Sequence, residues 1–162
     1  MHRIYENNDI VVFWNSEKCF HSRRCVTASP LTFDPMRKPW IDVTKDKNSN
    51  IWQAIESCPS GALSCTYRHD IDVKMDETNL RSVAYDGDKE IGECDYSSEG
   101  SVISIYHTGV DPAYEGKGIA KRLVYTILEY AERNKMEVNA TCSYAKKLIA
   151  DNKSNCLHGG EA

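Results

Sequence analysis

Long apolar runs are missing from this 162-residue chain. No stretch approaches the roughly 20 apolar residues that cross a bilayer as a helix, and the N-terminal residues lack the apolar segment of a secretory signal. We therefore expect a cytoplasmic protein with no membrane partner.

Concentrated positive charge is missing as well. The net charge is −4 at pH 7, and the lysines and arginines do not gather into a stripe interleaved with aromatic residues. Proteins that bind nucleic acid through its phosphates need such a stripe. We therefore expect no nucleic-acid partner.

Cysteine, in contrast, is abundant, with seven residues. An odd number of cysteines without an export signal favours thiols that are reduced or bound to metal over a framework of disulfides. Cys19 and Cys25 have five residues between them, and Cys58, which precedes a proline, follows after 32 more. Cys65 and Cys94 have no such context, and we interpret them as packing residues.

The spacing of these three cysteines resembles that of bacterial ferredoxins, in which one loop supplies most thiolates and a remote Cys-Pro supplies another. The strings Cys-x-His-Ser, Arg-Lys-Pro-Trp-Ile and Cys-Pro-Ser-Gly-Ala-Leu together look like a divergent single-cluster ferredoxin family over roughly residues 5–69. The resemblance implies that Cys19, Cys25 and Cys58 bind an iron–sulfur cluster, either [4Fe-4S] or [3Fe-4S].

The fourth ligand is open, because Ser22 stands where a ferredoxin has its second cysteine. A three-iron cluster needs only three thiolates, whereas a four-iron cluster would need His21, Ser22 or a remote group such as Cys65. His21 is favoured among these, since imidazole replaces thiolate in some iron–sulfur centres. Two other interpretations are that the cysteines are buried apolar residues or that they bind zinc.

Hydrophobic patterning and turn residues predict the elements of the first half. They indicate a strand over 8–14, an irregular segment over 29–39, a short strand over 40–43, a helix over 51–57 and a link between domains over 67–77.

In the second half of the chain, the hydrophobic pattern is more regular. Strands are predicted over 80–85 and 90–96 around an Asp-Gly turn, with further strands over 102–110 and 136–141, helices over 119–133 and 143–150, and a frayed tail over 152–162. The fold class is α/β (α+β), with a small iron–sulfur domain at 1–69 and a mixed, mostly antiparallel sheet at 70–162.

Two glycines stand between the predicted strand over 102–110 and the helix that follows. Gly116 and Gly118 allow the backbone to approach a ligand closely, and the first-turn amides of a helix attract anions. Neither a Walker lysine-serine pair nor a second strand–helix unit follows. We therefore expect the loop to bind a phosphate group.

The segment from Glu115 to Ala120 resembles the acyl-CoA pyrophosphate loop of the GNAT superfamily, written Gln/Arg-x-x-Gly-x-Gly/Ala. Glu115 departs from this pattern, and Lys117, Lys121 and Arg122 are expected to offset its charge. The resemblance implies that acetyl-CoA is bound by Val110, Glu115, Gly116, Lys117, Gly118, Ile119, Ala120 and Lys121.

His107 and Cys142 are the candidate catalytic residues. An imidazole suits a base at neutral pH, and a thiol at a helix N-terminus has a lowered pKa. His107-Thr108-Gly109-Val110, the glycine loop and Cys142-x-Tyr-Ala together resemble small, minimal GNAT-like proteins over roughly residues 73–152. Two routes are open: Cys142 accepts the acetyl group with His107 as its base, or the amine attacks directly with His107 as base and Cys142 as proton donor.

The predicted function is therefore N-acetyl transfer from acetyl-CoA to a small-molecule or protein amine, with an iron–sulfur domain of redox or regulatory role and a possible redox partner. The alternative is a non-catalytic iron–sulfur electron carrier or sensor fused to a CoA-binding module. Turnover of acetyl-CoA with a panel of amines distinguishes the two.

Overall fold

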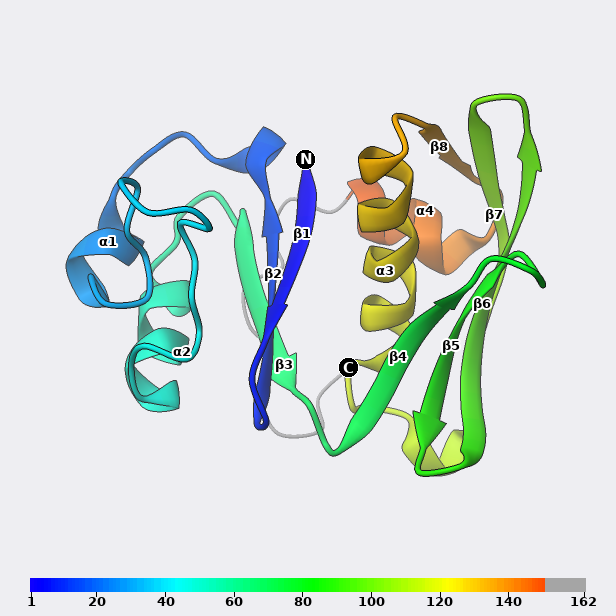
Figure 1. Ribbon diagram of the computed structural model, residues 1–162, viewed down its shortest axis with the longest axis horizontal. Helices are drawn as coiled ribbons and strands as arrows, with labels where there is room; N and C mark the ends of the chain where they lie inside the picture. Colours follow the sequence, from blue (N-terminus) through cyan, green and yellow to red (C-terminus); the bar gives the residue numbers. More distant parts are fainter. Residues whose placement is uncertain (151–162) are drawn as a thin grey trace. The chain divides into compact units, whose positions relative to one another are not determined.

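The chain forms two compact units in the computed structural model, which describes residues 1–150 (Figure 1). One unit is formed by Arg3–His69, and the other begins at Asp70. The tail predicted to fray, 152–162, lies outside the described residues. No helix in the described part is long and apolar enough to cross a bilayer.

The first unit contains a three-stranded sheet in the order β1-β2-β3. β2 and β3 are antiparallel, with Ile10 opposite Tyr67 and Trp14 opposite Leu63. The elements of this unit are β1 (His2–Glu6), β2 (Ile10–Asn15), η1 (Ser16–Lys18), α1 (Arg24–Ala28), α2 (Asn48–Glu56) and β3 (Leu63–Tyr67).

Both helices cover the same side of this sheet (Figure 1). The core between them is built from β2, the loop after α1, α2 and β3, and it includes Val12, Phe33, Ile51, Ile55 and Cys65. β2 is a continuous apolar run, and Ile10, Val11, Val12 and Phe13 are all buried, so this strand is covered on both faces.

The strand predicted over 40–43 is wrong. Its apolar residues lie in a loop whose only strand-like contact is the bridge between Phe33 and Ile41. The Arg37 guanidinium holds this loop, because it donates hydrogen bonds to the backbone carbonyls of residues 31, 32, 39 and 40, at 3.1, 2.7, 3.2 and 3.5 Å. Ile41 is buried and Trp40 is half-buried, and both pack against the core of the first unit.

The second unit contains a five-stranded sheet in the order β4-β5-β6-β7-β8. All pairs are antiparallel except β7 and β8, which are parallel, so the predicted mixed, mostly antiparallel sheet is confirmed. The elements are β4 (Ile71–Asp76), β5 (Arg81–Asp86), β6 (Lys89–Glu99), β7 (Val102–Val110), η2 (Pro112–Tyr114), α3 (Ile119–Arg133), β8 (Glu137–Ala140) and α4 (Ser143–Ala150).

The predicted link over 67–77 is wrong, since most of it is strand. β4 pairs with β5 along its whole length, from Ile71 opposite Asp86 to Asp76 opposite Arg81. Its sequence, Ile-Asp-Val-Lys-Met-Asp, alternates strictly between apolar and charged residues, which is the pattern of an edge strand with one buried face.

Helix α3 packs on one face of this sheet. The Ser82 hydroxyl donates a hydrogen bond to the Leu123 carbonyl at 2.8 Å, and Cys94, the partner of Ser82 in the sheet, is fully buried. Because side chains alternate along a strand, Glu93 and Asp95 point to the opposite face.

A bulge in β7 changes this alternation. Tyr96 lies opposite Ile105, whereas Asp95 lies opposite His107, so that Tyr106 is the extra residue. Thr108 then lies opposite Cys94. His107 consequently shares the carboxylate face with Asp95, and Thr108 shares the face that α3 covers.

Strands β7 and β8 separate beyond Ile105. β8 pairs only with Val102–Ile105, and the backbone amides of Thr141 and Cys142 both donate to the Ile105 carbonyl at the point of separation. In the described part of the chain, no strand pairs with residues 106–110 on this side. The last half of β7 therefore presents free backbone groups beside the candidate residues.

Candidate metal centre and candidate active site

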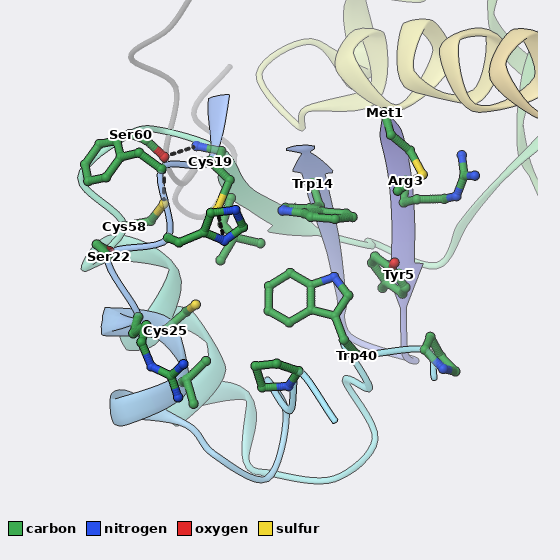
Figure 2. Close-up of a pocket in the computed structure, with 18 of the residues that line it drawn as sticks. Met1, Arg3, Tyr5, Trp14, Cys19, Ser22, Cys25, Trp40, Cys58 and Ser60 are labelled. Carbon is green, nitrogen blue, oxygen red and sulfur yellow. Dashed lines mark hydrogen bonds between the residues drawn. The ribbon is translucent and has the colours of Figure 1, made fainter. Parts of the chain in front are cut away.

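A pocket of about 600 Å³ in the first unit contains all three predicted cluster ligands. Cys19 follows η1, Cys25 lies in α1 and Cys58, which is remote in the sequence, follows α2; all three line one hollow (Figure 2). Trp14 and Trp40 form the opposite wall.

The three thiols influence one another electrostatically. Burial raises the pKa of Cys25, and the neighbouring Cys58 and Cys19 raise it further. Three thiolates in one hollow repel each other, and bound metal removes this repulsion because its positive charge compensates theirs.

Cys58 lies among hydrogen-bond donors. Burial raises the pKa of its thiol, but the Ser60 hydroxyl at 3.4 Å and the backbone amides of Leu63, Ser60 and Ala62 outweigh burial and leave the pKa lowered. Donors of this kind stabilise a thiolate, which is the form that binds metal.

His21 is the described group that best fits a fourth position. Its φ of 60° and the φ of 64° at Arg23 are left-handed, a conformation that residues other than glycine seldom adopt outside functional sites. This turn brings His21 Nδ1 to 3.9 Å from Cys19 Sγ. His21 and Ser22 are both exposed, and the Ser22 hydroxyl is 3.5 Å from the Arg24 amide.

Cys65 is excluded as a fourth ligand. It is fully buried in the core of the first unit, as a packing residue should be, and it is disulfide-bonded. The expectation that the thiols are all reduced or metal-bound is therefore wrong for Cys65, while the other five described cysteines are free. Three thiols and an imidazole around one hollow remain, a donor set that fits an iron–sulfur cluster.

The glycine loop of the second unit lies between β7 and α3. Gly116 has a φ of 78° and Gly118 a φ of 73°, both left-handed, which explains the two glycines because a Cβ is strained there. Gly118 is the N-cap of α3, and no side chain caps this helix. The amide end of a 15-residue helix therefore faces the loop without a competing carboxylate or hydroxyl.

The charges around this loop differ from the expectation. Glu115 is exposed, so its carboxylate faces solvent. Arg122 is buried and donates to the Ile71 carbonyl at 2.8 Å, so its expected role against Glu115 is wrong. Lys121 is also buried, with Nζ 5.8 Å from the centre of the Tyr125 ring. Lys117 is the half-buried cation of the loop itself.

His107 lies among carboxylates. One side-chain ligand atom from each of Glu93, Asp95 and His107 lies within 4.8 Å of the others. Burial raises the pKa of Asp95 and nearby Glu93 raises it further, while His107 opposes the shift. Neither carboxylate was predicted, because their approach to His107 depends on the bulge in β7.

The absence of a side chain at Gly109 leaves room for the His107 imidazole. A Cβ at position 109 would lie 3.0 Å from His107 Nε2, a separation shorter than nearly all Cβ contacts in proteins. The imidazole therefore lies over the backbone of this glycine.

Cys142 lies at the start of α4 and contacts Thr108. Burial raises the pKa of its thiol, but the backbone amide of Ala145, the Thr108 hydroxyl and further amides outweigh burial and leave the pKa lowered. The Cys142 thiol is 3.5 Å from the Thr108 hydroxyl, which is 3.4 Å from Cys94 Sγ. Burial raises the pKa of Cys94 to about 12, which suits the packing role predicted for it.

The structure does not bring His107 and Cys142 into contact. Cys142 lies against Thr108, on the face that α3 covers, whereas the side chain of His107 points to the carboxylate face. A base at His107 acting directly on the Cys142 thiol has no support in this arrangement, because the two side chains lie on different faces of β7.

Comparison with protein families assigns both units. The family described as a divergent 4Fe-4S mono-cluster matches residues 5–68, and the family described as GCN5-related N-acetyl-transferase matches residues 81–156. Protein YjdI of Escherichia coli is 38% identical over 68 residues, which are 42% of this chain and 87% of that protein.

Further relatives match the second unit. Human protein NATD1 is 33% identical over 51 residues, 32% of this chain and 45% of that protein, so the chain spans less than half of it. The solution structure of a GCN5-like protein from Staphylococcus aureus is 28% identical, with a TM-score of 0.40, and covers 49% of this chain and 78% of that one.

These matches define the class of protein as a divergent iron–sulfur domain joined to an acetyltransferase domain. The chain belongs to the divergent 4Fe-4S mono-cluster family through residues 5–68, and its second unit carries a GCN5-related N-acetyltransferase domain. The predicted family resemblances are thus confirmed for both halves.

Proposed function

We propose that the second unit transfers the acetyl group of acetyl-CoA to an amine and that the first unit holds a [4Fe-4S] cluster with a redox or regulatory role. The observation that carries the transferase proposal is the loop with Gly116 and Gly118, both left-handed, at the uncapped start of α3. Such a loop suits a pyrophosphate, and the free edge of β7 beside it offers backbone groups to the rest of the cofactor.

The chemistry needs a base and an acid on either side of the reacting thioester. His107 takes a proton from the attacking amine, whose nitrogen bonds to the acetyl carbon while the carbon–sulfur bond breaks. Cys142 gives a proton to the departing CoA sulfur, and solvent restores both groups. Asp95 is close enough to His107 to hold the orientation of the imidazole.

Release of free CoA thiol from acetyl-CoA, measured with a panel of amines and polyamines, tests the transferase proposal. We expect acceptor-dependent release that is lost in His107→Ala. Tight binding of acetyl-CoA without turnover of any amine would instead favour a CoA-binding module.

Gly109→Ala is expected to lower kcat/KM at least tenfold. The added Cβ would lie 3.0 Å from His107 Nε2, so the imidazole must shift by a few tenths of an ångström, and small displacements of a catalytic group are costly. Gly100→Ala is the control, since a Cβ at Gly100 meets nothing within 4 Å. Equal kcat/KM in the Gly109 variant and wild type would remove His107 from the reaction.

The pH dependence of kcat separates the two roles of Cys142. Its thiol has a lowered pKa, so the protonated form is lost as pH rises through a value below that of an ordinary thiol. If Cys142 is the proton donor, kcat falls on this alkaline limb, and the limb disappears in Cys142→Ala. A rise in kcat over the same range, with an acetyl adduct on Cys142 by intact mass spectrometry, would establish the covalent route.

A second candidate function is a non-catalytic iron–sulfur electron carrier or redox sensor with a CoA-binding module. It is favoured by the thiol pocket, whose lining includes the aromatic residues Tyr5, Trp14, Phe20 and Trp40 beside the three cysteines. Anaerobic purification followed by absorbance and electron paramagnetic resonance spectroscopy tests for the cluster in either case.

A further inference from the structure

Two buried donors face no acceptor beside the thiol pocket. Nε1 of Trp14 and Nε1 of Trp40 are both buried, and neither has a hydrogen-bond partner within the described residues. Both indoles line the pocket that contains Cys19, Cys25 and Cys58. Because buried N–H groups are nearly always paired, an acceptor that is not part of the protein chain is expected here.

Trp40 has a weak acceptor in its neighbour. The two indole rings meet edge to face, with centroids 5.1 Å apart and an interplanar angle of 69°. Figure 2 shows the Trp40 nitrogen on the edge of its ring that approaches Trp14. An N–H group directed at an aromatic face makes a weak hydrogen bond, so Trp40 needs no further partner.

Trp14 has no such neighbour on its nitrogen side. Figure 2 shows its indole nitrogen turned toward Cys19, on the side of the ring that faces the thiols. The residue lies on β2, paired with Leu63, and Trp40 packs against its ring. Strand pairing and the edge-to-face contact with Trp40 therefore fix the direction of this N–H.

We propose that Trp14 Nε1–H donates a hydrogen bond to a sulfur atom of the cluster bound by Cys19, Cys25 and Cys58. This inference rests on the proposed cluster and adds a residue that tunes it. A hydrogen bond to a cluster sulfur stabilises the more negative, reduced form and so raises the reduction potential. Trp14 thus tunes the reduction potential of the first unit's cluster and is not one of its ligands.

The test compares Trp14→Phe with wild type and with Trp52→Phe in the full chain. Trp52 stacks on Tyr67 at 4.7 Å and does not line the thiol pocket, so it controls for loss of an indole. Iron and sulfide are determined first, and reduction potentials are then measured by anaerobic redox titration. We expect full loading in all three proteins and a shift to more negative potential in Trp14→Phe alone.

A second measurement needs no variant. Wild-type protein labelled with ¹⁵N in its tryptophan indoles should show a hyperfine coupling of one indole nitrogen, and of one exchangeable proton, to the paramagnetic cluster. Absence of both couplings overturns the inference, as does an unchanged potential in loaded Trp14→Phe. Wild-type protein that contains no iron and sulfide would instead overturn the proposed cluster itself.

Discussion

Cys58→Ser is expected to leave the protein without iron and acid-labile sulfide. Cys58 lies among the Ser60, Ala62 and Leu63 amides that lower the pKa of its thiol, and serine at this position offers a far poorer ligand to iron. Because the three cysteines come from three segments, loss of one removes a thiolate that no neighbouring cysteine replaces. Iron and sulfide analysis of anaerobically purified protein measures the effect, and Cys19→Ser and Cys25→Ser should behave alike.

Cys94→Ala is the control, since it removes a free, buried cysteine that does not line the pocket. Its iron and sulfide should equal those of wild type. Full loading of Cys58→Ser would refute the ligand assignment. Zinc in place of iron and sulfide in the wild type would identify a different metal centre, which three thiols and an imidazole are also able to form.

Gly118→Val is expected to abolish detectable binding of acetyl-CoA. Gly118 has a φ of 73° and caps α3, so a β-branched residue must either adopt a strongly strained conformation or rotate the first-turn amides away from the pyrophosphate. A loss of affinity of at least 100-fold corresponds to about 2.8 kcal/mol. Isothermal titration calorimetry with acetyl-CoA measures it.

Gly100→Val provides the control for backbone strain. Gly100 also has a positive φ, of 61°, but lies in a hairpin turn with open space around its Cβ position. Its variant should lose some stability and keep its affinity for acetyl-CoA. Unchanged affinity in Gly118→Val, with an intact fold by circular dichroism, would show that the glycine loop does not bind the cofactor.

The residue types and the hydrophobic pattern of the segment from β7 to α3 predicted its structure correctly. Both loop glycines have the left-handed φ that their residue type suggests, and α3 begins at the residue after Gly118. The strictly alternating sequence of β4 carried the same kind of signal, but its three charged residues made it resemble a linker. The short length and the charge of this segment favoured a linker, whereas the two-residue alternation of apolar and charged residues correctly indicated a strand.

Long-range pairing explains what the sequence could not predict. The approach of Asp95 to His107 depends on the bulge at Tyr106, which leaves no mark in composition or spacing. The loop over 40–43 resembles a strand because its apolar residues are buried, but the Arg37 guanidinium and its carbonyl acceptors shape it instead. The unpaired nitrogen of Trp14 likewise becomes visible only when its surroundings are known.

The bulge in β7, and not the sequence of this strand by itself, decides which face carries the imidazole. If the same residues paired regularly with β6, His107 would lie opposite Cys94 with its imidazole toward α3, and Thr108 would point toward the carboxylates, although every side chain remained present. A search for related proteins by residue identity alone would accept both arrangements. Only the pairing of β7 with β6 separates chains that place the histidine beside the carboxylates from those that share only its letters.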